Sequence, residues 1–112
     1  MPVYNKLVRD KILEMIEEKG LSYYARTLES EEFIKAIKTK MIEEATEFHE
    51  ANNSRESVEE LADLLELIHT AIRVLGVSFE ELEATREQKK KIRGGFEKRI
   101  FLLDVEDPSG SL

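Results

Sequence analysis

Apolar residues recur along most of the chain at intervals of three and four, the spacing that places side chains on one face of an α-helix. The first such run covers residues 7–19, and longer runs follow over residues 30–52 and 55–75. A fourth run extends from about residue 78 to residue 93. The pattern predicts an all-α fold, an antiparallel bundle of about four helices.

Residue types that favour helix ends separate these runs. Glycines follow the first, third and fourth runs, at Gly20, Gly76 and Gly94-Gly95. Ser30 is expected to cap the second helix, and Ser78 with Glu81 has the spacing of a capping box for the fourth.

The remaining connections have patterns of their own. Asn52-Asn53-Ser54 predicts the turn between the second and third helices. Residues 21–28 are expected to be extended, and residues 96–103 fit either a short strand or a last helical turn.

Length and composition narrow the protein class. The 112 residues predict one domain over residues 1–104 and a polar C-terminal tail over residues 105–112. The chain has no cysteine, no apolar run of membrane-spanning length and no apolar core near its start that would suit a signal peptide. We therefore expect a cytoplasmic protein without a membrane partner.

Net charge limits the choice of ligand. The formal charge of −7 argues against nucleic acid as a partner, and binding through the basic segment 89–99 is the alternative. A phosphorylated substrate would require a local cation to reverse the sign of the field.

Two acidic pairs stand on either side of the predicted turn. Glu44 and Glu47 are three residues apart, as are Glu60 and Asp63, so each pair lies on one helix face. Both pairs are centred on the same turn, and an antiparallel hairpin would therefore place Glu44 level with Asp63 and Glu47 level with Glu60. Four carboxylates would then converge on one small volume.

Glu44 continues an apolar stripe that includes Ile37 and Met41, and Asp63 precedes Leu67 and Ala71 on its own helix face. Carboxylates in line with apolar stripes are unusual, because burying an unpaired charge costs several kcal/mol. A hard cation would relieve the mutual repulsion, and oxygen ligands suit Mg²⁺ or Mn²⁺. The simpler alternative is a set of solvated helix carboxylates in a chain with 24 Asp and Glu residues. We expect solvent to surround Glu43, Glu50, Glu56 and Glu59. The alternative for Glu43 is a supporting role, in which it contacts the metal ligands and not the metal.

The motif Glu43-Glu44-x-x-Glu47 followed by Glu60-x-x-Asp63 resembles the signature of the MazG-like all-α nucleoside triphosphate pyrophosphohydrolases, a superfamily that includes phosphoribosyl-ATP pyrophosphohydrolase. Residues 4–12 and the segment Lys91-x-Arg93-Gly94-Gly95-Phe96 resemble a small-protein branch of it. Leu13 departs from that branch, where proline is frequent.

The resemblance implies Mg²⁺-dependent cleavage between the α and β phosphates of a nucleotide, which gives a monophosphate and pyrophosphate. It implies that the metal ligands are Glu44, Glu47, Glu60 and Asp63. One of the four carboxylates is expected to orient or deprotonate the attacking water. We choose Glu47 for this role, although the sequence does not distinguish it from the other three. The function would then be removal of unwanted or non-standard nucleotides.

Basic residues are also needed to meet the outer phosphates. Lys90 and Arg93 stand beside the diglycine and are the first candidates, with Lys6 and Arg9 as a second cluster. Lysines in a last helical turn also oppose the helix dipole without any ligand. Lys6 and Arg9 equally suit ion pairs that hold the N-terminal segment in place.

The third helix is apolar over more than one face. A homodimer or homotetramer would cover the excess, and the resemblance also implies a core completed by oligomerisation. Burial by the first and fourth helices is the competing explanation. The alternative to an enzyme is a non-catalytic helical module that binds a nucleotide or a metal for regulation.

Overall fold

The computed structural model describes residues 4–106 and residue 109, and within them the chain is all-α, as predicted, with no strand. The described residues up to Phe79 form one compact unit, and those from Glu80 onward form a second. The prediction of a single domain over residues 1–104 stays a prediction. The helices are α1 (Ile12–Glu18), α2 (Ser30–Glu50), α3 (Ser54–Leu75) and α4 (Phe79–Arg93).

The helix α1 ends as predicted but begins later. The predicted start at residue 7 is wrong, because residues 7–9 are irregular and the helix begins at Ile12. At its end, Gly20 adopts a left-handed φ of 73°, and Leu21 N–H donates to the Ile16 carbonyl at 3.2 Å. This bond closes the last turn in the way that a left-handed glycine permits.

The helix α2 begins at Ser30 itself, so the prediction of Ser30 as the cap is wrong by one residue. Glu29 is the capping residue and forms a capping box with Glu32. A carboxylate suits this position because it accepts backbone N–H bonds at the positive end of the helix dipole. Residues 21–29, which lead into it, form neither helix nor strand.

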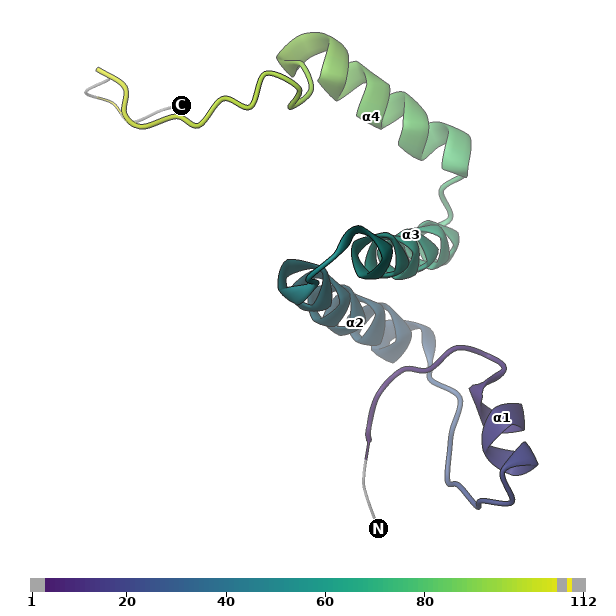
Figure 1. Cartoon of the computed structure of the whole chain (residues 1–112). Coiled ribbons are helices and arrows are strands. Elements are labelled where there is room, and N and C mark those ends of the chain that lie inside the picture. Colours follow the sequence, from purple (N-terminus) through teal and green to yellow (C-terminus); the bar gives the residue numbers. More distant parts are fainter. Residues whose placement is uncertain (1–3, 107–108, 110–112) are drawn as a thin grey trace. The chain divides into compact units, whose positions relative to one another are not determined.

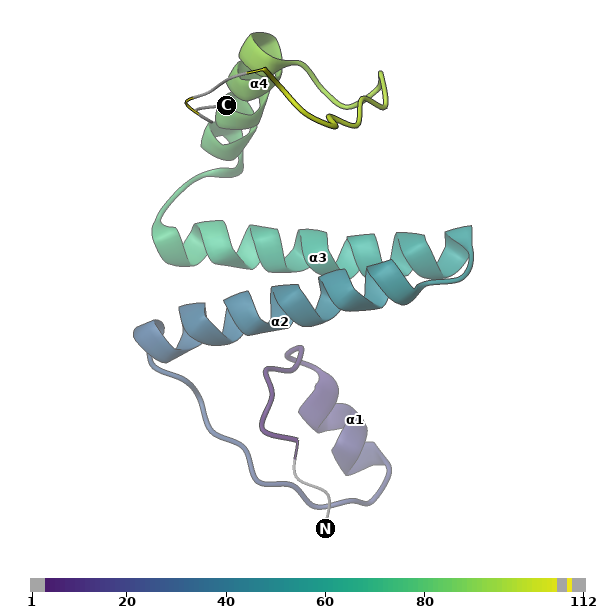
Figure 2. The same ribbon diagram turned by 90° about the vertical axis from the view of Figure 1, so that its left-hand side faces the viewer.

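The predicted turn between α2 and α3 is confirmed. Asn53 caps α3, and its side-chain oxygen accepts a 2.9 Å hydrogen bond from the Glu56 N–H. The two helices run antiparallel and side by side (Figures 1 and 2). Among the described residues, α2 and α3 are the pair of helices that pack against each other. Gly76, with a φ of 73°, ends α3 as predicted.

The hairpin has a small core. Among the described residues, Ile37 of α2 is fully buried and Ile72 of α3 is 8% exposed, and these are its buried apolar side chains. Both lie in the part of the hairpin away from the turn, about two helical turns beyond the acidic pairs. The core therefore fixes the register of the two helices on one side of the carboxylates.

The second unit contains most of α4 and the residues that follow it. The helix ends at Arg93 as predicted, and Gly94 has a left-handed φ of 82°. Both alternatives for residues 96–103 are wrong, because residues 94–106 form neither a strand nor a helix. Most of the predicted polar tail at residues 105–112 lies outside the described residues.

Within the described part of the chain, no helix combines the length and the apolar character that crossing a membrane requires.

Candidate functional site

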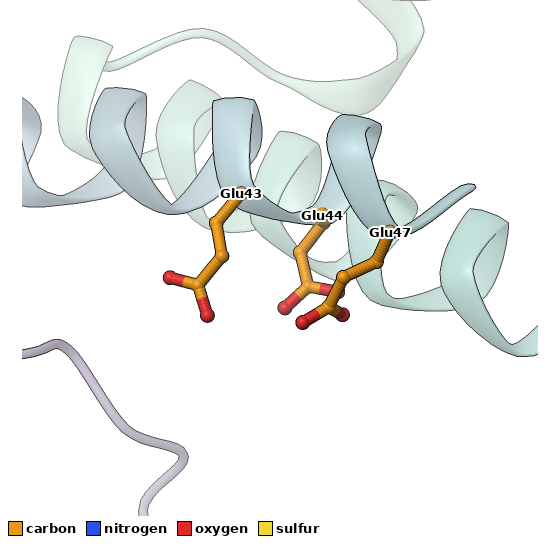
Figure 3. A group of neighbouring side chains, drawn as sticks. All are labelled: Glu43, Glu44 and Glu47. Carbon is orange, nitrogen blue, oxygen red and sulfur yellow. The ribbon is translucent and has the colours of Figure 1, made fainter. Parts of the chain in front are cut away.

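The acidic residues of the hairpin converge, as the register argument predicts. Oxygens of Glu44, Glu60 and Asp63 lie within 4.8 Å of one another, and those of Glu43, Glu44 and Glu47 form a second such group. Glu44 belongs to both groups and joins them. Figure 3 shows that the three side chains of α2 project to the same side of the helix. We call these five residues the carboxylate cluster.

Burial differs across the carboxylate cluster. Glu44 is 6% exposed and is the buried charged residue of the described chain, whereas Glu60 and Asp63 are half-buried and Glu47 is exposed. The Oε2 atoms of Glu44 and Glu60 are enclosed and accept no hydrogen bond from the described residues. Unpartnered oxygens of this kind are costly, and a cation bound between them would supply the missing interaction.

Crowding changes the protonation of the cluster. Burial, followed by contact with the carboxyl groups of Glu60 and Glu47, raises the pKa of Glu44 to about 8. For Glu60, contact with the carboxyl group of Glu44 lowers the pKa, but contact with Glu47, desolvation and the charges of Glu47 and Asp63 outweigh it, so that the net direction is upward. Without added positive charge, part of the cluster therefore keeps a proton near neutral pH.

Two basic side chains contact the cluster. Lys40 lies on α2 one turn before its partners, with its ammonium 3.5 Å from Glu43 and 3.8 Å from Glu44. Arg9 approaches from the N-terminal segment and donates a 2.6 Å hydrogen bond from Nη2 to Asp63 Oδ1. Two single positive charges cannot balance five carboxylates, which leaves room for a divalent ion.

A cavity of about 460 Å³ adjoins the cluster within the first unit. Glu44 and Asp63 line it together with Arg9, so carboxylates and a guanidinium face one space. The volume falls within the range of small-molecule sites. Its other walls come from the N-terminal segment, α2 and α3: Leu7, Val8, Asp10, Phe33, Lys40, Glu66, Leu67, Thr70, Arg73 and Val74.

The predicted phosphate-binding residues lie in two places. Arg9 is at the cluster, where it forms the ion pair that was the alternative to phosphate binding. Lys6 is exposed in the same segment, with its ammonium 5.6 Å from the centre of the Tyr4 ring. Lys90 and Arg93 lie near the end of α4 in the second unit. The assignment of all four to phosphate binding stays a prediction.

Two residues of the site were missed or underrated from the sequence. Lys40 was not considered, although its spacing of three and four residues before Glu43 and Glu44 is that of a helical ion pair. Glu43 was expected to be solvated, with a supporting role as the alternative, and it is half-buried beside Glu44 and Glu47. Its spacing from Glu47 could have placed both on one face.

Comparison with known proteins identifies the family. The family model described as phosphoribosyl-ATP pyrophosphohydrolase matches residues 4–90, which include the N-terminal segment and the whole carboxylate cluster. The matched region ends before the Arg93-Gly94-Gly95 segment. No curated protein and no solved structure matches the chain. Because the match spans well over half of the 112 residues, the chain belongs to the phosphoribosyl-ATP pyrophosphohydrolase family, a family of pyrophosphohydrolases.

Proposed function

We propose that the protein is a Mg²⁺-dependent nucleotide pyrophosphohydrolase. It cleaves the α–β phosphoanhydride of a nucleoside triphosphate, or of a related nucleotide such as phosphoribosyl-ATP, to a monophosphate and pyrophosphate. The observation that carries the proposal is the pair of enclosed oxygens on Glu44 and Glu60, which accept no hydrogen bond from the described residues and belong to a cluster of five carboxylates. Removal of unwanted or non-standard nucleotides is the biological role that we propose for this activity.

The donor set fits the metal. Carboxylate oxygens without sulfur or imidazole nearby are the ligands of a hard cation, so Mg²⁺ is our first choice and Mn²⁺ the substitute. Glu44, Glu47, Glu60 and Asp63 are the proposed ligands. When bound, the ion supplies positive charge for the phosphate oxygens and makes a coordinated water more acidic.

The chain's own residues then orient and deprotonate the nucleophile. Glu47 is exposed and contacts Glu44. Its proposed role is to accept a proton from the attacking water. In our proposal Arg9 and Lys6 of the first unit bind phosphate groups, and Lys90 and Arg93 of the second unit are further candidates for phosphate binding. Guanidinium and ammonium groups stabilise the negative charge that develops on the leaving pyrophosphate.

A nucleotide panel tests the proposal. Nucleoside triphosphates and phosphoribosyl-ATP are incubated with the protein and Mg²⁺, and the products are separated by anion-exchange chromatography. We expect monophosphate and pyrophosphate in equal amounts, and no turnover in EDTA. Glu47→Gln should turn over far more slowly than wild type. Glu59→Gln is its matched control, because Glu59 is a carboxylate on α3 with a side chain 66% exposed and paired to Arg55.

Three results would contradict the proposal. Release of a nucleoside diphosphate and inorganic phosphate would place the cleavage between the β and γ phosphates instead of between α and β. Full activity in EDTA would remove the metal from the reaction. Nucleotide binding without any product would favour a non-catalytic regulatory module.

We also propose that the protein is a homo-oligomer, a dimer or a tetramer. Along α3 an apolar stripe with alternating spacings of three and four residues remains largely uncovered within the first unit. Such a stripe is typical of a helix that packs against another helix. The stripe consists of Val58, Leu61, Leu65, Ile68, Ile72 and Leu75, of which Val58, Leu61, Leu65 and Leu75 are between 47% and 65% exposed.

A further inference from the structure

The ion pair of Arg9 and Asp63 connects the N-terminal segment, residues 4–11, to the carboxylate cluster. Arg9 precedes Asp63 by 54 residues, whereas Lys40 sits on the same helix as its acidic partners. Among the ion pairs of the cluster within the described chain, the Arg9 pair alone therefore comes from outside the α2–α3 hairpin. It joins a segment without helical structure to a residue that we propose as a metal ligand.

Arg9 and a divalent cation would compete for the same carboxylate. An oxygen of Asp63 lies within 4.8 Å of oxygens of Glu44 and Glu60, so the three share one candidate cation position. The pair itself is open to water, with the side chain of Arg9 61% exposed and that of Asp63 38% exposed. Exposed ion pairs are weak, and a double charge held among three carboxylates is favoured over one guanidinium at the edge.

After it leaves Asp63, Arg9 still faces the cavity, where its guanidinium can bind an anion. Its side chain lines the cavity that Glu44 and Asp63 also line. A guanidinium binds a phosphate group through two parallel hydrogen bonds, a geometry that an ammonium cannot reproduce. Leu7, Val8 and Asp10 of the same segment also line the cavity, so the segment can stay at the hairpin while Arg9 changes partners, but it is then held by one ion pair fewer and is more mobile.

We propose that Arg9 changes partners during ligand binding. In the metal-free protein Arg9 is the counter-ion of Asp63; when the cluster takes up a divalent cation, Arg9 leaves Asp63 and binds a phosphate group of the nucleotide. The identity of that anion rests on the proposed function. Cation binding then raises the affinity for the nucleotide in two ways. The ion neutralises the carboxylates directly, and it also frees Arg9 to bind a phosphate group.

The proposal predicts effects of opposite sign for one substitution. Removal of Arg9 eliminates a competitor for Asp63, so cation affinity should rise, and it eliminates a phosphate ligand, so anion affinity should fall. A purely structural role for Arg9 would lower both affinities. A role in orienting Asp63 for the metal would lower the cation affinity.

The first experiment measures Mn²⁺ binding by isothermal titration calorimetry. We expect Arg9→Ala to bind Mn²⁺ about two- to five-fold more tightly than wild type, the scale of an exposed ion pair. Arg26→Ala is the matched control, because Arg26 forms a similarly exposed 2.7 Å ion pair with Glu32 at the far end of α2. It removes the same charge and should leave the affinity unchanged. Unchanged or weaker Mn²⁺ binding by Arg9→Ala overturns the proposal.

The second experiment measures binding of manganese pyrophosphate to the Mn²⁺-saturated protein. Pyrophosphate carries the phosphate groups of the expected substrates without a base. We expect about ten-fold weaker binding by Arg9→Ala and a smaller loss for Arg9→Lys, which retains the charge without the paired donors. Equal binding by wild type and Arg9→Ala overturns the proposal.

The third experiment follows the segment directly. The chain has no cysteine, so a nitroxide on Lys11→Cys labels one position. Added Mg²⁺ should increase the mobility of the label when Arg9 is present and should leave it unchanged in the Arg9→Ala background. Equal responses in the two backgrounds contradict the exchange.

None of these measurements requires turnover. A protein that shows all three effects but cleaves no nucleotide would refute the proposed function and retain the exchange of Arg9. An active enzyme in which Arg9→Ala weakens Mn²⁺ binding would refute the exchange and retain the function.

Discussion

Glu44 is the residue on which the site depends, because it belongs to both carboxylate groups and is almost fully buried. Sequence reasoning found it through two features, its spacing from Glu47 and its position in line with the apolar stripe of α2. The same reasoning identified Glu60 and Asp63 through the symmetry of the hairpin. It missed Lys40, because the spacing of three or four residues was compared among carboxylates alone. A basic residue at the same spacing lies on the same helix face and can form an ion pair with them.

The raised pKa of Glu44 predicts how stability depends on pH in EDTA. Its folded pKa of about 8 exceeds the ordinary 4.5, so between these values the folded protein holds a proton that the unfolded chain has released. Stability of the metal-free protein should therefore fall, by a few kcal/mol, as pH rises from about 5 to 8, and Glu60 acts in the same direction. Urea unfolding at several pH values measures this.

Glu44→Gln is the test variant, because glutamine resembles the protonated side chain at every pH. In EDTA it should match wild type near pH 5 and exceed its stability near pH 8. Parallel pH profiles for the two proteins would show that Glu44 does not hold the proton. Saturating Mg²⁺ should reverse the order at the higher pH, since the ion needs the ionised carboxylate.

Glu47 should matter more for turnover than for metal binding. We expect Glu47→Gln to lower kcat at least about 100-fold, the usual contribution of a general base, with less than about ten-fold loss of Mn²⁺ affinity. Steady-state kinetics and calorimetry measure the two effects. An equal loss in both would make Glu47 an ordinary ligand and leave the base unassigned.

At the level of elements, helix ends that depend on local backbone requirements were predicted correctly from the sequence. Structure that depends on contacts between distant segments was not. Gly20 and Gly76 ended helices as expected, because a left-handed residue is a local requirement. Residues 7–9 have apolar spacing that continues into α1, yet they are irregular. These residues line the cavity together with residues of α2 and α3, and Arg9 forms an ion pair with Asp63 of α3. The spacing of apolar residues in one sequence does not reveal such contacts between distant segments.

The cap of α3 is the element-level prediction. Asn53→Ala removes the acceptor for the Glu56 N–H and should reduce the free energy of unfolding by about 1 kcal/mol. Asn52→Ala is the matched control, because only the backbone N–H of Asn52 is bonded in the described structure. Chemical denaturation of both variants decides, and equal losses would contradict the capping role.

For the whole molecule, the apolar stripe of α3 is the main feature that the first unit leaves uncovered. Ile37 and Ile72 are the buried apolar side chains among the described residues, too few for a stable core by themselves. The sequence predicted this excess, since one hairpin cannot cover a helix that is apolar on more than one face. It could not say which surface covers the stripe, because periodicity carries no information about the partner.

Sedimentation equilibrium tests the oligomer. We expect wild type to sediment as a dimer or tetramer at micromolar concentration, and Leu61→Arg/Leu65→Arg to shift toward monomer or to unfold, because both positions lie on the stripe. Tyr24→Arg is the control, as its side chain is 97% exposed in the connection before α2. A monomeric wild type would contradict the proposal.

The most direct test of the central claim is an anomalous difference map from a crystal grown with Mn²⁺. The account predicts a peak within bonding distance of carboxylate oxygens of Glu44, Glu60 and Asp63, with Glu47 beside it. A strong peak elsewhere, or none at the cluster while the four side chains face solvent, would contradict it.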